Sequence, residues 1–74
     1  MTPEALEAFY SERGYKKDRY GKWMSPNGNK RVCIMTRVLR IESKLTYDDG
    51  SHKWVRLRSA FLGTLRVTGE GRLA

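Results

Sequence analysis

The chain has 74 residues and a mass of 8.6 kDa, which is enough for one domain, residues 1–74, and excludes two. It has 15 Lys and Arg residues against 8 Asp and Glu residues, so its formal net charge is +7. With 39% hydrophobic and 31% charged residues, the composition is typical of a globular protein. A single cysteine and a single histidine exclude an internal disulfide and a structural zinc site. The core must therefore come from packing, or from a second copy of the chain.

The first segment predicts a helix from Pro3 to about Arg13. Thr2 is a good N-cap, Pro3 suits the first helical position, and Gly14 suits the left-handed residue that follows a helix. An apolar stripe with three- and four-residue spacing is formed by Ala5, Leu6, Phe9 and Tyr10. We expect this stripe to pack against the rest of the chain.

Antiparallel strands are predicted from about residue 18 to residue 68, and Asn27-Gly28 is a strong signal for the first hairpin turn. A two-residue loop places Trp23 opposite Val32. A three-residue loop that begins at Pro26 instead places Tyr20 opposite Ile34. Both loops have suitable turn residues, so the pattern leaves open which of the two aromatic residues is buried.

The alternation of apolar residues changes phase between Lys30 and Tyr47. The first apolar residues have even numbers: Val32, Ile34 and Val38. The later ones have odd numbers: Leu39, Ile41, Leu45 and Tyr47. Since a strand has a period of two, a continuous strand needs a bulge or sharp bend near Val38-Leu39. We therefore predict an α+β fold: an N-terminal helix packed on a small, strongly bent antiparallel sheet of four to five strands, curled toward a half-barrel.

Asp48-Asp49-Gly50 predicts the second hairpin turn, with Gly50 in the left-handed conformation. Counting outward from this turn gives three predicted pairs: Tyr47 with Ser51, Ser43 with Val55, and Ile41 with Leu57. Leu57 is then expected in the core, where truncation to Ala would cost about 2 to 5 kcal/mol. A last strand is predicted from Thr64 to Thr68.

The other face of this hairpin predicts the functional surface. Trp54 lies there among Arg40, Glu42, Lys44, Arg56 and Arg58. Cations neutralise phosphates, and an exposed aromatic ring can stack on an unpaired base. Basic residues of the first hairpin extend the field: Lys16, Lys17, Arg19, Lys22, Lys30 and Arg31. We expect DNA or RNA to bind mainly through its backbone, at a site formed by Lys22, Lys30, Arg31, Arg40, Lys44, Trp54, Arg56 and Arg58.

Two other interpretations fit the same pattern. One side of an antiparallel sheet is often solvated, and alternating Lys and Arg are common there. Trp, Tyr and Arg also anchor protein interfaces, so the surface could belong to a protein-interaction module, homodimeric or bound to an acidic protein. Exposure of Trp23 and Trp54 among arginines would favour nucleic acid, whereas an apolar patch that joins them to Met35 and Phe61 would favour a protein partner.

Gly21-Lys22-Trp23 followed by Asn27-Gly28-Asn29-Lys30-Arg31 resembles the strand-turn-strand segment of the arm-type DNA-binding domains of phage integrases. The resemblance covers about a dozen residues. Those domains place their helix after the sheet, whereas the predicted helix of this chain comes first. The resemblance implies DNA binding for this hairpin and assigns no family.

Motifs of catalysis are absent: the chain has no glycine-rich phosphate loop, no HExxH and no Gly-x-Ser-x-Gly. Cys33 lies in an apolar run, which is typical of a structural thiol, and His52 is interpreted as a solvated turn residue. We therefore expect a protein that is not an enzyme and has no cofactor, metal or membrane contact. A lone cysteine and the lack of a secretory signal after Met1 favour a cytoplasmic location.

Overall fold

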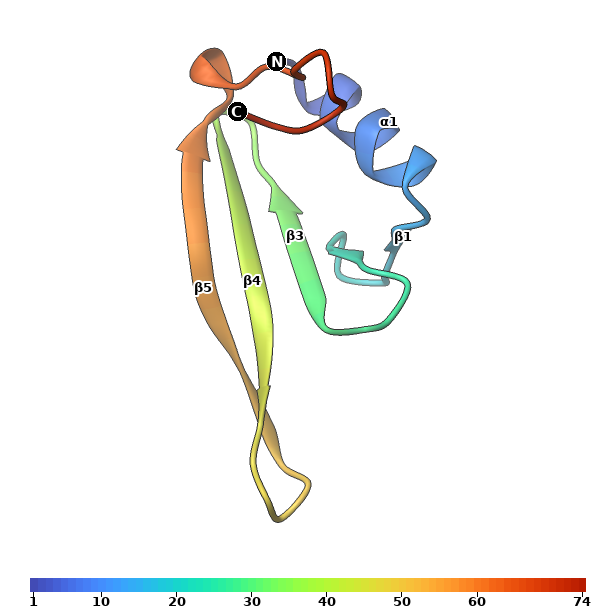
Figure 1. Cartoon of the computed structure of the whole chain (residues 1–74), viewed down its shortest axis with the longest axis vertical. Coiled ribbons are helices and arrows are strands. Elements are labelled where there is room, and N and C mark those ends of the chain that lie inside the picture. Colours follow the sequence, from blue (N-terminus) through green and yellow to red (C-terminus); the bar gives the residue numbers. More distant parts are fainter.

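The computed structural model describes all 74 residues as one helix and an open five-stranded antiparallel sheet, which is an α+β fold (Figure 1). The helix α1 spans Pro3–Glu12. The strands follow in the spatial order β1-β2-β3-β4-β5, so β1 and β5 are the edges. Their bounds are Lys16–Lys17, Trp23–Met24, Lys30–Ile34, Val38–Thr46 and His52–Phe61, and a 3-10 helix, η1, covers Leu62–Thr64.

The predicted helix is confirmed at both ends. Thr2 Oγ1 accepts a hydrogen bond from the backbone N–H of Ala5 at 3.1 Å, and Pro3 begins the helix. Gly14 follows the C-cap with a φ of +84°, a conformation that favours glycine. Leu6 and Tyr10 are the buried residues of the apolar stripe. Burial raises the pKa of Tyr10 to about 12, so this hydroxyl stays neutral in the core.

The core lies between α1 and one face of the sheet, which we call the inner face. Six hydrophobic side chains are buried there: Leu6, Tyr10, Val32, Leu39, Leu62 and Leu65. Val32 and Leu39 come from β3 and β4, and each is 1% exposed. Their neighbours along the strands point to the opposite face, which we call the outer face.

The first hairpin adopts the register that places Trp23 opposite Val32. Its loop is longer than the two residues predicted for that register. The Ser25 N–H donates to the Lys30 carbonyl oxygen at 2.9 Å, which leaves Pro26–Asn29 as a four-residue connection. Trp23 packs against the core, whereas Tyr20 is 74% exposed.

The prediction of one continuous strand with a bulge or sharp bend near Val38-Leu39 is wrong. Residues 30–47 form two strands joined by a turn, in which the Met35 N–H donates to the Val38 carbonyl oxygen at 2.9 Å. The reversal pairs Val32 with Ile41 and Ile34 with Leu39, so even positions on β3 share a face with odd positions on β4. A change of direction therefore explains the change of phase.

The second hairpin has the predicted turn. The Tyr47 N–H donates to the Ser51 carbonyl oxygen at 2.8 Å, and Gly50 has a φ of +87°. Ser43 pairs with Val55 as predicted, but Ile41 pairs with Arg58, because the register shifts between Ile41 and Glu42. Leu57 is the extra residue of a bulge on β5 and is 57% exposed, so its predicted pairing and its core position are wrong.

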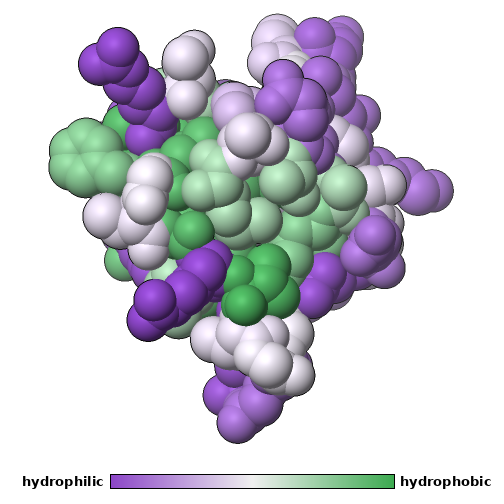
Figure 2. Space-filling model, turned by 90° about the horizontal axis from the view of Figure 1, so that it is seen from above, coloured by the Kyte–Doolittle hydropathy of each residue, from purple (hydrophilic) through white to green (hydrophobic).

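Residues 64–68 do not join the sheet as the predicted last strand. After η1, the chain forms a small hairpin in which Val67 and Leu73 make an isolated bridge. Leu65 is buried, while Val67 is 44% exposed. The N-terminal ammonium of Met1 donates to the Leu62 carbonyl oxygen in η1, and Figure 1 shows the C-terminus at the same end of the molecule. Figure 2 shows this end of the molecule, where apolar atoms gather between polar ones.

Beyond the row of Ser43 and Val55, β4 and β5 continue without a third strand, since β3 begins at Lys30 opposite Ser43. We call the hairpin of β4 and β5 from Ser43 to Leu57 the arm, and the rest of the molecule the body. The arm extends away from α1 and both termini (Figure 1), in a molecule whose principal extents are 40 × 26 × 20 Å.

Candidate nucleic-acid interface

The outer face gathers most of the predicted site. Residues directly opposite each other in antiparallel strands point to the same side. Arg31 pairs with Glu42, Glu42 with Arg56, and Lys44 with Trp54. Arg40 pairs with Cys33 and has the same parity as Glu42 and Lys44. The outer face therefore holds Arg31, Arg40, Lys44, Trp54 and Arg56 around one carboxylate, Glu42.

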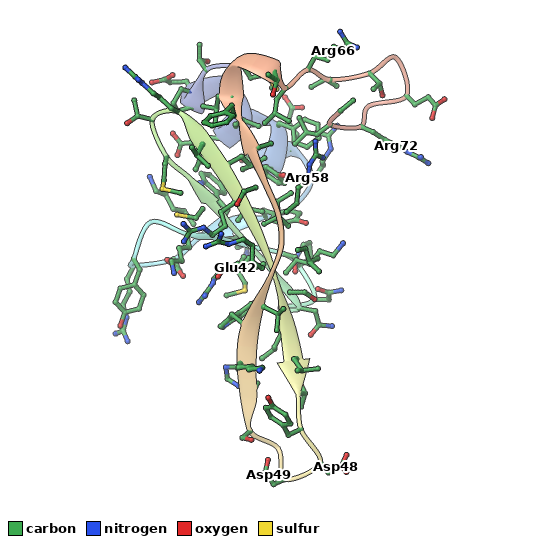
Figure 3. All side chains as sticks on the ribbon, turned by 90° about the vertical axis from the view of Figure 1, so that its left-hand side faces the viewer. Glu42, Asp48, Asp49, Arg58, Arg66 and Arg72 are labelled. Carbon is green, nitrogen blue, oxygen red and sulfur yellow. The ribbon has the colours of Figure 1, made fainter.

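Two predicted site residues lie on the inner face instead. The bulge at Leu57 reverses the orientation of Arg58, which pairs with Ile41 and affects the charge environment of Tyr10 in the core. Figure 3 shows Arg58 and Glu42 on opposite sides of the ribbon. Lys30 pairs with Ser43 and also belongs to the inner face. Both cations are exposed, but neither shares a face with Trp54.

At the centre of the outer face, Arg31 is held between Glu42 and Trp54. Its Nε–H donates to Glu42 Oε1 at 2.9 Å, and its guanidinium carbon lies 4.3 Å from the centre of the Trp54 ring. The two charged side chains are 19% and 15% exposed. A guanidinium over an indole is a favourable cation–π arrangement, worth more when it is partly desolvated. Arg31 is therefore a structural residue of this face as well as a source of charge.

The charge around Glu42 is strongly positive. Burial acts to raise the pKa of this carboxyl, but the hydrogen bond and charge of Arg31, with the charges of Lys22 and Arg40, outweigh it and hold the pKa below its ordinary value. Glu42 therefore stays ionised at neutral pH. It neutralises one of the surrounding cations and leaves the others in excess.

Four cations of the predicted site that lie on the outer face have no carboxylate partner. The ion pairs of the molecule are Lys17 with Glu7, Arg31 with Glu42, and Arg72 with Glu70. The four unpaired cations are Arg40, Lys44, Arg56 and Lys22, the last of which lies two residues before Met24, the partner of Arg31. Arg40 also has a buried Nε–H without any hydrogen-bond acceptor, which is costly in a protein interior. This surface holds uncompensated positive charge on a rigid sheet.

The cations of β1 and its turn divide between the two faces. Lys16 pairs with Met24, which pairs with Arg31, so Lys16 extends the outer field. Lys17 points to the helix side, where its Nζ lies 3.4 Å from a Glu7 carboxylate oxygen. The guanidinium carbon of Arg19 lies 5.0 Å from the centre of the Tyr20 ring, and both residues belong to the exposed turn. Only part of the positive charge predicted for the first hairpin therefore lies on the outer face.

The aromatic residues are arranged differently from the prediction. Trp54 is half-buried, and Arg31 covers one side of its ring. The imidazole of His52 meets the indole edge-on, with 6.3 Å between the ring centres. His52 thus belongs to the outer face, a position that alternation with Trp54 could have indicated. Trp23 packs on the core and Trp54 is half-buried, so the criterion of two tryptophans exposed among arginines is not met.

The structure contains no group of three or more His, Cys, Asp or Glu side chains able to hold a metal ion. None of its helices is both long enough and apolar enough to cross a membrane. Cys33 is half-buried on the outer face as a free thiol.

Comparison of the chain with models of known protein families gave no match, and comparison with curated proteins and with solved structures gave none either. The local resemblance of residues 21–31 to integrase arm-binding domains is not accompanied by a family match. The function is therefore argued from the geometry of the outer face.

Proposed function

We propose that this protein is a non-catalytic nucleic-acid-binding module of the cytoplasm that uses its outer face to bind the phosphate backbone. The observation that carries the proposal is the group of four unpaired cations, Lys22, Arg40, Lys44 and Arg56, on one face of the sheet. Placing phosphates on this face neutralises charge that the protein leaves uncompensated, and it releases counterions from the nucleic acid.

Backbone contact accounts for the arrangement better than base stacking does. The Trp54 ring is already stacked against Arg31, so only its other side is free for a base. We therefore expect duplex and single-stranded molecules to bind with similar affinity, and sequence to have little effect. The strong bend predicted for the sheet remains part of this proposal, because a curved cationic face follows a cylindrical duplex better than a flat one.

The test is the affinity of the full chain for a duplex of about 20 base pairs and for one of its strands, measured by fluorescence anisotropy across about 50 to 200 mM salt. If the four cations each neutralise one phosphate, the slope of log K against log salt is about −3.6 on the duplex. Absence of binding at about 50 mM salt and tens of micromolar protein would overturn the proposal.

Arg56→Ala and Arg58→Ala are matched variants for this experiment. They remove the same charge from positions two residues apart, but the two side chains lie on opposite faces. We expect Arg56→Ala to make the slope less steep by about 0.9 and Arg58→Ala to leave it nearly unchanged. Equal effects would mean that net charge, and not the outer face, determines binding.

A further inference from the structure

The outer face ends, beyond its cations, in an exposed aromatic ring. Val38 and Phe61 are the last residues that pair between β4 and β5. They belong to the outer face, because their neighbours Leu39 and Ala60 pack in and against the core. Phe61 is 69% exposed. A shallow hollow at this end is lined by Val38, Ser59, Ala60 and Phe61.

The backbone around Phe61 is held in place by its neighbours. The N–H of Leu62 donates to the Arg37 carbonyl oxygen at 2.9 Å, and Thr64 Oγ1 donates to the Phe61 carbonyl oxygen at 2.9 Å. Leu62 is 3% exposed and belongs to the core. Only the rotation of the Phe61 side chain therefore has to be ordered when a ligand binds, which keeps the entropic cost of binding low.

Phe61 is the free aromatic ring of the outer face. Arg31 covers one side of the Trp54 ring, and His52 meets its edge. Phe61, in contrast, takes part in none of the ring–ring or cation–π contacts of the molecule. A base can therefore stack on Phe61 without displacing another side chain.

The next outer row along the strands supplies a cation. Arg40 pairs with Ser59, two residues along β5 from Phe61. This separation is about 7 Å, which is close to the distance across a sugar from a phosphate to its base. Arg40 has no carboxylate partner, and its Nε–H has no acceptor. Its guanidinium is therefore not engaged within the molecule and remains available to a phosphate.

The size and the charge of this end select a nucleotide as its occupant. A stable protein contact buries about 800 Å² on each partner, which is far more than one ring beside one valine at a sheet edge. Two charged rows separate Phe61 from Trp54, so the continuous apolar patch that favours a protein partner is not formed. An unpaired base needs only one aromatic ring to stack on, and the neighbouring cations suit its phosphates.

We propose that Phe61 stacks an unpaired base whose phosphate is bound by Arg40, so that the outer face binds the junction between a duplex and a single strand. This inference rests on the proposed function. The duplex backbone lies along Lys44 and Arg56, and the strand that leaves the duplex passes Arg40 and reaches Phe61. The phenyl ring has no polar atom, so any base can stack there. A single strand gains the stacked base but has the lower charge density, which keeps its affinity close to that of a blunt duplex.

The test compares three kinds of duplex of about 20 base pairs by fluorescence anisotropy of the full chain at about 50 mM salt. One is blunt, one carries a short single-stranded overhang at its 3′ or 5′ end, and one carries the same overhang with abasic nucleotides. The better base-bearing overhang is expected to bind at least about fivefold more tightly than the other two kinds, because it adds one stacked base. Equal affinity for base-bearing and abasic overhangs would overturn this inference and leave the backbone contact intact. Absence of binding to all three would overturn the proposed function as well.

Phe61→Leu and Phe61→Trp separate the aromatic ring from an apolar side chain. We expect Phe61→Leu to remove the preference for the base-bearing overhang, a loss of at least about fivefold, and to change the affinity for the blunt duplex by less than about twofold. Phe61→Trp should keep the preference, because it keeps a ring. An equal loss for the blunt duplex in Phe61→Leu would assign the residue a structural role and overturn the inference.

Tyr47→Leu is the matched control. It removes another exposed ring, 45% exposed, from the inner face near the tip of the arm. This variant should keep every affinity within about twofold of the original, because the side chain lies on the other face. A preference for the overhang that persists in Phe61→Leu would leave this ring to another partner, such as a protein, and would overturn the inference. Circular dichroism confirms that each variant is folded.

Discussion

The two long strands β4 and β5 run through both the body and the arm, but their inner-face side chains are buried to very different extents in the two regions. On the inner face of the body, Leu39 is 1% exposed, whereas Leu45, six residues further along β4, is 45% exposed. Inner-facing and outer-facing side chains alternate in the same way in both regions. The regions differ in whether the helix covers them: α1 has 10 residues and is about 15 Å long, while the 10 residues of β5 extend about 34 Å.

This comparison separates stability from recognition. The helix is long enough to cover only the upper part of the strands, so packing stabilises the body. The arm has two faces of different character: the outer face is cationic, and the inner face carries exposed apolar side chains around Lys53. Neither face contributes much to the core. Substitutions in the two regions are therefore expected to have different consequences.

The largest expected difference is in stability. Leu39→Ala should lower the free energy of unfolding by about 2 to 5 kcal/mol, because it empties a buried site. Leu57→Ala should lower it by less than about 1 kcal/mol, because this side chain is 57% exposed. Urea denaturation followed by circular dichroism measures both. Equal losses would show that the arm is as well packed as the body.

The ion pair on the outer face gives the next effect. Glu42→Ala leaves the half-buried Arg31 without its carboxylate and should cost about 1 to 3 kcal/mol. Glu42→Gln is the matched control, because it keeps the shape and a hydrogen-bond acceptor without the charge.

The same pair predicts a dependence on pH. The folded state lowers the pKa of Glu42, so the stabilisation is present above the pKa of the unfolded carboxyl and is lost as the pH falls through the folded value. The difference in unfolding free energy between the original chain and Glu42→Gln should therefore shrink on acidification. A difference that is constant from neutral to acidic pH would contradict this.

Trp54→Ala should have an intermediate effect that divides between folding and binding. The side chain is half-buried under Arg31, so we expect a loss of about 1 to 2 kcal/mol in stability, less than for Leu39→Ala. Nucleic-acid affinity should fall by about 1 kcal/mol, the lower end of the range for base stacking. Anisotropy measured on the folded variant separates the two losses. A loss above about 3 kcal/mol in binding alone would assign Trp54 a direct role in stacking.

How far the sequence predicts this structure depends on how local each signal is. The helix with Thr2 and Gly14, and the turn with Gly50, follow from residues whose backbone preferences act within a few positions. The turn at Met35-Thr36-Arg37 has no Gly, Pro or Asn, so the sequence predicts a bulge or bend there and not a reversal of the chain. The phase change was visible, but its cause was not.

For the candidate site, alternation placed Arg40, Lys44, Trp54 and Arg56 together, and the strand pairing agrees. The bulge at Leu57 has no sequence signal of its own, because it depends on packing across β4, and it moves Arg58 to the other face. The stacking of Arg31 on Trp54 joins residues from two strands that are not adjacent in the sheet. Alternation within one hairpin cannot predict such a contact.

Salt should have a large effect that is specific to binding. Raising it from about 50 to 300 mM is a sixfold change, so a slope of about −3.6 lowers the affinity for duplex by about 600-fold. Anisotropy across the salt series measures this loss. An affinity that does not change with salt would contradict contact with phosphates.

The most direct test of the central claim, that the outer face is the nucleic-acid interface, uses the single cysteine. Cys33 pairs with Arg40 on the outer face, and Leu57→Cys in a Cys33→Ser background places a thiol on the inner face. The rate of reaction with a small thiol reagent is measured with and without saturating duplex. We predict that the duplex slows the reaction of Cys33 several-fold and leaves the engineered thiol at position 57 unchanged. Protection of position 57 with no change at Cys33 would contradict the account.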